Sequence, residues 1–326
     1  MILLVVAASP LLAADVPSSL PKDSLPAKLA FDTVPLGLAD RTLPKDNPLT
    51  EGRVQLGRNL FFDPILSADN TVACASCHQP AHGFASAEAK PRGIRGQQLT
   101  RRAPSLLNRA YGTAFFWDGR ATSLEEQALQ PIENQHEMGS TVAAAVERLQ
   151  ANKDYSAQFA KAFDDGVTSA NLAKALASFE RTLLRGDSPV DRFRRKGEHA
   201  AMTPAQRHGL WLYESKARCW RCHSGPNFTD EGLHNTGVSW GKEPTDLGRY
   251  MVTKKDADKG RFKTPTLRGV ALSAPFMHDG SLKTLEDVVR LYNQGGVANP
   301  NLDPILAPLQ LSDDEVRNLV EFLKSL

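Results

Sequence analysis

Hydrophobic positions along the chain recur mainly with helical spacing. Leu172, Leu176, Phe179 and Leu183 lie three or four residues apart, which is the spacing of one buried helix face. Segments with the alternating pattern of a half-buried strand are almost absent. The pattern therefore predicts a mainly α fold with little β structure.

Helix-start signals support this prediction. Residues 123–126 (SLEE) and 312–315 (SDDE) match the capping box, in which a hydroxyl and a later carboxylate satisfy free amides. Thr203-Pro204 joins a good N-cap residue to a proline suited to the first helical turn. Residues 57–62 (GRNLFF) and 209–213 (GLWLY) are each expected to lie in an amphipathic helix that ends shortly before a pair of cysteines.

Length and composition exclude several classes of protein. A chain of 326 residues, 41% of them hydrophobic, is long enough for about two domains with real cores. Its 23 glycines and 21 prolines are ordinary numbers, so a collagen-like or wholly disordered chain is excluded. A net charge of +2 argues against a nucleic-acid-binding protein. No internal apolar run approaches the roughly 18 residues of a membrane span.

The first residues resemble an export signal. Residues 2–14 are apolar and end in small residues, which fits the core and cleavage site of a secretory signal peptide. We expect cleavage after Ala13 or Ala14, although the usual positive leader is missing. A buried N-terminal helix is the weaker alternative, because polar, proline-rich sequence follows.

All four cysteines fall in two C-x-x-C-H motifs, Cys74 to His78 and Cys219 to His223, with Cys77 and Cys222 as the second cysteines. This motif is typical of c-type haem attachment: two thiols add to the haem vinyl groups and the histidine binds iron. A zinc site is the alternative. It is disfavoured by the histidine after both pairs and by a separation of 145 residues (219 − 74). We expect two covalently bound c-type haems and no disulfide.

The similar segments before the two motifs indicate an internal duplication, with two cytochrome c-like haem domains. We expect a signal peptide at 1–14, an N-terminal extension at 15–48, and haem domains at 49–190 and 191–326. The boundary is placed in the polar stretch 186–201. We interpret its basic cluster as a solvated linker, with a docking patch for an acidic electron donor as the alternative; the cluster comprises Arg192, Arg194, Arg195 and Lys196.

Further motifs make the sequence resemble the bacterial di-haem cytochrome c peroxidase and MauG family from residue 57 to about residue 323. They are 60–64 (LFFDP), 116–120 (FWDGR), Glu137-Met138, 262–267 (FKTPTL) and 277–280 (MHDG). The resemblance implies that the N-terminal haem reacts with peroxide. It also implies that the C-terminal haem stores and relays electrons.

The resemblance assigns roles to individual residues. His78 and His223 match the proximal iron ligands, and Trp117 matches a tryptophan that relays electrons between the haems. Trp117 could instead be a core aromatic residue. Gln127 and Glu137 match the distal pocket of the reactive haem, where the carboxylate moves the proton that peroxide cleavage requires.

Two departures from typical peroxidases favour MauG-like features. Typical members carry a histidine some sixteen residues after the first proximal histidine, whereas residues 93–96 (GIRG) contain none. This absence suggests a permanently open iron. Typical members also ligate the second haem with a methionine, and the matching position here is Tyr292, a residue type that can ligate haem. Packing of Tyr292 with Leu285 and Val288 on one helix face is the alternative, with Met277 as the substitute ligand.

The resemblance also implies a calcium site between the haems. Ser273 and Pro275 align with two positions that contribute oxygen ligands. Arg102 stands where an asparagine ligand is expected, although its backbone carbonyl could still serve.

Together, these features predict a periplasmic di-haem peroxidase that reduces hydrogen peroxide to water. Its electrons would come from a small donor protein, a cytochrome or a cupredoxin, through the C-terminal haem. One alternative is a MauG-like enzyme that oxidises residues of a partner protein through an oxidised state shared by both haems. A simple di-haem electron carrier is the non-enzymatic alternative. The resemblance also allows a homodimer, because dimers are common in the family.

Overall fold

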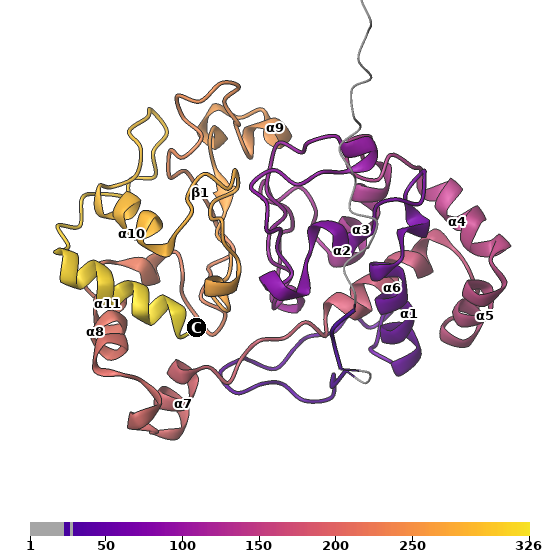
Figure 1. The fold of residues 1–326 in the computed structure, drawn as a ribbon, viewed down its shortest axis with the longest axis horizontal. Coiled ribbons are helices and arrows are strands. Elements are labelled where there is room, and N and C mark those ends of the chain that lie inside the picture. Colours follow the sequence, from indigo (N-terminus) through magenta and orange to yellow (C-terminus); the bar gives the residue numbers. More distant parts are fainter. Residues whose placement is uncertain (1–22, 27–28) are drawn as a thin grey trace, which may run out of the picture.

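The structure, a computed structural model, describes residues 23–26 and 29–326 (Figure 1). The predicted signal peptide and part of the predicted N-terminal extension lie outside the described residues. In the described part, helices dominate, and the sheet consists of the short antiparallel strands β1 (Leu233–His234) and β2 (Phe262–Lys263). The mainly α prediction is therefore confirmed. None of the helices described is long and apolar enough to cross a bilayer.

The chain forms two halves that lie side by side (Figure 1). The first half contains α1 (Glu51–Phe62), α2 (Cys74–Cys77), α3 (Leu124–Glu133), α4 (Val142–Ala151), α5 (Lys153–Ala162) and α6 (Ser169–Glu180). The second contains α7 (Pro189–Lys196), α8 (Pro204–Glu214), α9 (Tyr250–Thr253), α10 (Leu285–Asn293) and α11 (Asp313–Lys324). Short 3-10 turns occupy Pro64–Leu66, Pro80–His82, Ile94–Gly96, Arg109–Tyr111, His199–Ala201, Cys219–Arg221, Asp256–Asp258 and Val270–Leu272.

The helix-start signals act nearly as expected. Ser312 caps α11 with a complete capping box, and Thr203 caps α8 with one completed by Gln206. At α3 only half of the predicted box forms. Ser123 accepts the backbone N–H of Glu126, but the Glu126 carboxylate accepts from Thr122, outside the helix.

Each half is built on a helix pair that crosses at a glycine. Gly57 of α1 packs on α6, where a Cβ atom added to the glycine would lie 1.9 Å from the carbonyl oxygen of Ala175. Gly209 of α8 packs on α11, where an added Cβ would lie 2.1 Å from the carbonyl oxygen of Asn318. The two pairs therefore use the same device, since only glycine allows so close an approach. Leu183 lies beyond the end of α6, although it is buried as its spacing predicted.

The turns also repeat between the halves. Phe116 and Met277 both adopt a positive φ, near 63° and 70°, and each is followed three residues later by a glycine with positive φ. Another residue with positive φ lies eight positions earlier in each case, Asn108 before Phe116 and Gly269 before Met277. The repeat therefore places Trp117 and His278 at equivalent positions, which supports an internal duplication.

The predicted linker is more ordered than expected. Arg194, Arg195 and Lys196 are exposed as predicted, but they belong to α7. Asp191 of this helix is buried and accepts two hydrogen bonds from the Arg268 guanidinium, at 2.7 and 2.9 Å. This ion pair fixes α7 to the second half. The residue limits of the two haem domains stay a prediction.

Candidate active site

Both predicted proximal histidines are oriented by the same hydrogen bond. The Nδ1 atom of His78 lies 2.9 Å from the carbonyl oxygen of Phe84, and that of His223 lies 3.1 Å from the carbonyl oxygen of Phe228. Because a carbonyl oxygen only accepts, Nδ1 must carry the hydrogen in each ring. Nε2 is therefore left with a lone pair, as a metal-ligating imidazole requires.

Burial favours the uncharged form of both histidines and of three of the cysteines. It lowers the pKa of His78, and it lowers the pKa of His223 to about 4, so both imidazoles are neutral at pH 7. Burial raises the pKa of the Cys74, Cys77 and Cys219 thiols to about 12. All four cysteines are unbridged in the structure.

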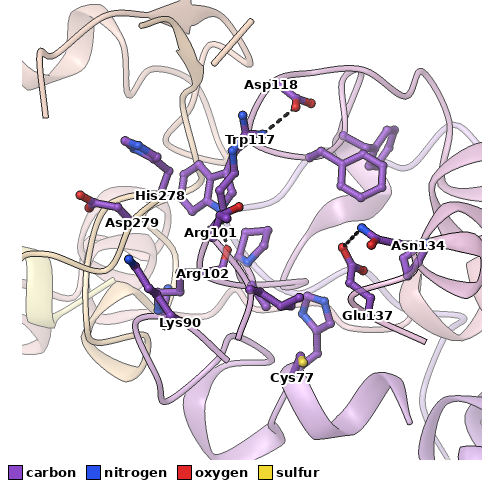
Figure 2. Close-up of a pocket in the computed structure, with 18 of the residues that line it drawn as sticks. Cys77, Lys90, Arg101, Arg102, Trp117, Asp118, Asn134, Glu137, His278 and Asp279 are labelled. Atoms are coloured by element: carbon purple, nitrogen blue, oxygen red, sulfur yellow. Dashed lines mark hydrogen bonds and ion pairs between the residues drawn. The ribbon is translucent and has the colours of Figure 1, made fainter. Parts of the chain in front are cut away.

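A cavity of about 1270 Å³ lies beside the first motif, between the two halves (Figure 2). It is larger than the roughly 300–1,000 Å³ of ordinary ligand pockets, so it has room for a macrocycle. Two thiols and a free imidazole nitrogen at its wall fit a covalently attached haem. The predicted residues that line it are Cys74, Cys77, His78, Arg102, Trp117, Gln127 and Glu137.

Glu137 offers the cavity a partly buried carboxyl group. Asn134, at the end of α3, donates a hydrogen bond from Nδ2 to Oε1 of Glu137 at 2.8 Å (Figure 2). Burial raises the pKa of Glu137, although Arg120 and Asn134 act in the opposite direction. A carboxyl group whose pKa is raised toward neutrality can both accept and return a proton efficiently.

Residues 93–96, where typical peroxidases would carry a histidine, pack directly beside Glu137. The N–H of Ile94 donates to the Glu137 carbonyl oxygen at 2.8 Å. Gly93 fits so closely that an added Cβ would lie 2.0 Å from the carbonyl oxygen of His136. The Ile94 side chain is 2% exposed and packs in the N-terminal hydrophobic core, while Arg95 is exposed to solvent. This segment therefore brings no imidazole to the cavity. The open iron stays a prediction.

Trp117 lies where the halves meet (Figure 2). Its indole N–H donates to the carbonyl oxygen of Arg102 at 2.7 Å, and its ring centroid is 6.4 Å from that of His278. His278 stacks on Phe262 at 3.6 Å, and its buried Nε2 has no partner among the described residues. The sequence singled out His278 only as part of a motif. The structure adds it to the wall of the cavity.

In the second half, Tyr292 lies near the second haem motif. Burial raises the pKa of its hydroxyl, and the neighbouring Cys222 and Cys219 add to this effect. Leu285 and Val288 belong to the C-terminal hydrophobic cluster, but Tyr292 does not. Ligation of the second haem by Tyr292 stays a prediction.

Of the three residues predicted for calcium, Arg102 brings a cation to the place instead of a side-chain oxygen. The Arg102 side chain points a guanidinium toward the protein's own carbonyl groups, including that of Ala274 between Ser273 and Pro275. The Arg102 carbonyl accepts from Trp117, and the Ser273 hydroxyl donates to Val270 at 3.0 Å. A cationic side chain cannot ligate a metal cation.

Sequence reasoning missed Glu180, which also lines the cavity. Glu180 is 6% exposed, and burial raises its pKa to about 8. A signal was present: Glu180 continues the spacing of Leu172 and Leu176, so it lies on the buried face of α6. A carboxyl group at a core position is a candidate functional group.

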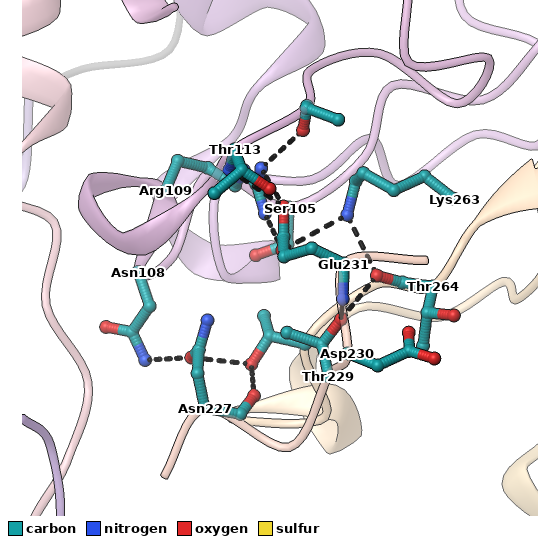
Figure 3. Close-up of polar contacts among 12 residues, drawn as sticks. Ser105, Asn108, Arg109, Thr113, Asn227, Thr229, Asp230, Glu231, Lys263 and Thr264 are labelled. Atoms are coloured by element: carbon teal, nitrogen blue, oxygen red, sulfur yellow. Dashed lines mark hydrogen bonds and ion pairs between the residues drawn. The ribbon is translucent and has the colours of Figure 1, made fainter. Parts of the chain in front are cut away.

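A cluster of charges that joins the halves was also missed (Figure 3). Arg109 of the first half makes two hydrogen bonds to the Glu231 carboxylate of the second, at 2.7 and 2.9 Å. The Nζ atom of Lys263 lies 3.5 Å from Glu231. Burial, and then the charge of Arg109, lowers the pKa of Lys263 to about 7. Next to this cluster, Asn108 donates to Asn227 across the same interface at 3.1 Å.

Comparison with known proteins agrees with this geometry. Residues 51–200 match the family model described as di-haem cytochrome c peroxidase. The methylamine utilization protein MauG of Methylorubrum extorquens is 42% identical over 87% of this chain and 80% of its own length. Cytochrome c551 peroxidase of Pseudomonas aeruginosa is 35% identical over 86% of this chain and 80% of its own.

A solved structure shows the same fold. The crystal structure of a MauG-like protein associated with microbial copper homeostasis superposes with a TM-score of 0.82 at 30% identity. The match covers 92% of this chain and 95% of that chain. With relatives this similar over most of its length, the chain is an oxidoreductase that belongs to the di-haem cytochrome c peroxidase and MauG family.

Proposed function

We propose that this protein is a periplasmic peroxidase that reduces hydrogen peroxide to water with electrons from a small donor protein. The observation that carries the proposal is the partly buried Glu137 carboxyl, whose pKa is raised, on the wall of the cavity that His78 also lines. A haem held there by Cys74, Cys77 and Nε2 of His78 would supply the redox chemistry that cleaves the O–O bond. His223 and Tyr292 would hold the second haem.

Glu137 is the proton carrier in this proposal. In its ionised form it accepts a proton from one oxygen of hydrogen peroxide and returns it to the other oxygen, which leaves as water. The hydrogen bond from Asn134 holds the carboxyl in place for both transfers. Gln127 lines the same cavity and offers peroxide a hydrogen-bonding amide. Over the whole cycle, the donor supplies two electrons, two protons are taken up from solvent, and two water molecules are formed.

Trp117 connects the two halves electronically in this proposal. Its hydrogen bond to the Arg102 carbonyl fixes the indole at the interface, and its ring faces His278 of the other half. An aromatic ring at this position shortens the distance over which an electron must pass between the halves.

The test is the replacement Glu137→Gln in the holoprotein, followed by rapid mixing with hydrogen peroxide. An amide keeps the size of the side chain but cannot carry the proton, so we expect the peroxide reaction to slow by about 10²–10⁴-fold. Both haems should stay attached. Glu133→Gln, which changes an exposed glutamate four residues away, is the matched control and should react normally. Unchanged kinetics in Glu137→Gln would remove Glu137 from the catalytic role.

A MauG-like oxidation of a partner protein is the second candidate function. Its support is the position of Tyr292 near the second motif but outside the hydrophobic cluster, together with the high similarity to MauG. The discriminating experiment asks what returns the peroxide-treated protein to its resting spectrum, a reduced donor cytochrome or a particular protein side chain. A simple electron carrier would show two low-spin haems and no reaction with peroxide.

A further inference from the structure

We propose that the guanidinium of Arg102 takes the place of the calcium ion that the family resemblance implies between the two haems. The protein would then carry its own cation at the junction of its halves and would not depend on calcium. This inference is independent of the peroxidase function proposed above.

The first argument is the position of the guanidinium. Arg102 is 4% exposed, and its Nη2 donates to the carbonyl oxygens of Ser86 at 2.6 Å and Ala274 at 3.4 Å. Ser86 belongs to the first half, while Ala274 lies in the second half between the two predicted calcium-binding residues, Ser273 and Pro275. Backbone carbonyl oxygens are groups that calcium uses as ligands. In this protein the Arg102 guanidinium, not a metal ion, contacts the Ala274 carbonyl between the two predicted ligands.

The second argument is that residue 102 offers no side-chain oxygen to a metal, and its backbone is already engaged. Its backbone carbonyl accepts the indole N–H of Trp117 at 2.7 Å, and its backbone N–H donates to the His278 carbonyl at 2.7 Å. The Arg102 backbone thus holds both Trp117 and His278, whose rings meet edge to face across the interface. The side chain that would provide an amide oxygen in an asparagine provides only N–H donors in arginine.

The third argument is electrostatic. The buried Arg102 guanidinium forms no ion pair with a carboxylate among the described residues. A divalent cation beside this uncompensated positive charge would be repelled. The buried Nε of Arg102 also has no partner in the described structure, and the residue lines the haem cavity. The Nε–H is a further donor at this place, and a donor cannot ligate a metal cation.

The first experiment uses the holoprotein with both haems attached. The protein is equilibrated with calcium, desalted and assayed for bound metal, and its thermal unfolding is compared in excess calcium and in excess calcium chelator. We expect far less than one calcium per chain and the same unfolding midpoint in both conditions. One calcium per chain, or a midpoint that drops in chelator, would overturn the proposal.

The second experiment uses Arg102→Asn, which restores an amide oxygen and removes the guanidinium. We expect its unfolding midpoint to fall in chelator and to recover in calcium, with about one calcium bound per chain. Arg92→Asn, which removes an exposed arginine, is the matched control and should show no calcium response. A folded Arg102→Asn protein that ignores calcium would contradict the assignment of this place as a latent calcium site. If that variant does not fold, the calcium content and chelator response of the unaltered protein still decide the question.

Discussion

At the scale of single residues, burial sets the protonation of two carboxyl groups that line one cavity. Glu137 and Glu180 both have a raised pKa, and for Glu180 the value reaches about 8. Glu137 has a hydrogen bond from Asn134 that favours its ionised form, whereas the Oε2 atom of Glu180 has no partner in the described structure. Glu180 is therefore mostly protonated at pH 7.

Replacing Glu180 by Gln should stabilise the protein at alkaline pH. The folded state keeps the Glu180 proton up to about pH 8, whereas an unfolded glutamate loses it near its ordinary value of 4.5. Since the folded state binds the extra proton, stability falls as pH rises through this window, and the full cost is present above pH 8. We expect Glu180→Gln to gain on the order of 1–3 kcal/mol at pH 8 and much less at pH 5.

Denaturant unfolding of the holoprotein at the two pH values measures this difference. Glu147→Gln, which changes an exposed glutamate of α4, should leave the stability unchanged at both. An equal gain for Glu180→Gln at pH 5 and pH 8 would mean that Glu180 does not titrate as proposed.

How far the site residues could be predicted differs from residue to residue. The haem motifs are visible in the sequence because their chemistry requires fixed neighbours, Cys77 beside His78 and Cys222 beside His223. Glu137 carries no such signal, because a surface glutamate and a buried one look alike without a family resemblance. Glu180 could have been found from its helical spacing alone.

At the scale of secondary-structure elements, local signals predicted the helices well. N-cap residues act on amides within the same turn, so Ser312 and Thr203 could be recognised from their neighbours. The prediction of a capping box at α3 was only half right, because the Glu126 carboxylate accepts hydrogen bonds from Thr122 and not from the N-cap residue Ser123. What the sequence could not indicate was the partner of each helix, because packing partners are far apart in the chain.

Two glycine replacements within α1 should have opposite effects. Gly57→Ala places a methyl group against the Ala175 carbonyl of α6, so we expect a loss of about 1–3 kcal/mol in the free energy of unfolding. Gly52→Ala meets only ordinary contacts at 3.8 Å with Ala162, and a helical alanine is favoured over glycine by up to about 1 kcal/mol. Chemical unfolding of both variants tests the packing of α1 on α6. A Gly57→Ala variant as stable as Gly52→Ala would show that the two helices do not approach so closely.

At the scale of the whole molecule, the contacts between the two halves could not be predicted from the sequence. Arg109 and Glu231 are 122 positions apart, and nothing in the local pattern of either marks them as partners. The same holds for the contact of Trp117 with His278, although the internal duplication explains why the two rings occupy equivalent turns. These contacts form the walls of a shared cavity, so the site depends on the pairing as much as on the motifs.

Replacing Glu231 by Gln should destabilise the protein more at low pH than at high pH. The Glu231 carboxylate compensates Arg109 at both pH 6 and pH 9, but it compensates Lys263 only while that amine is charged, below its pKa of about 7. Removing one partner of a buried ion pair typically costs about 3–5 kcal/mol. We therefore expect a loss of about this size at pH 6 and a smaller loss at pH 9, where Lys263 is neutral. Glu286→Gln, which breaks an exposed pair with Arg290 on α10, should cost less than about 0.5 kcal/mol at either pH.

Unfolding of the Glu231→Gln holoprotein in denaturant at pH 6 and pH 9 measures both losses. A loss that is the same at both values would show that Lys263 stays charged across the range and that Arg109 alone depends on Glu231. A negligible loss would show that the charges at the junction are hydrated, and the junction would then rest on Arg101, which pairs with Asp118 of the first half and Asp246 of the second. Because the cavity is walled by both halves, the peroxide reaction of Glu231→Gln should weaken in parallel with its stability at pH 6.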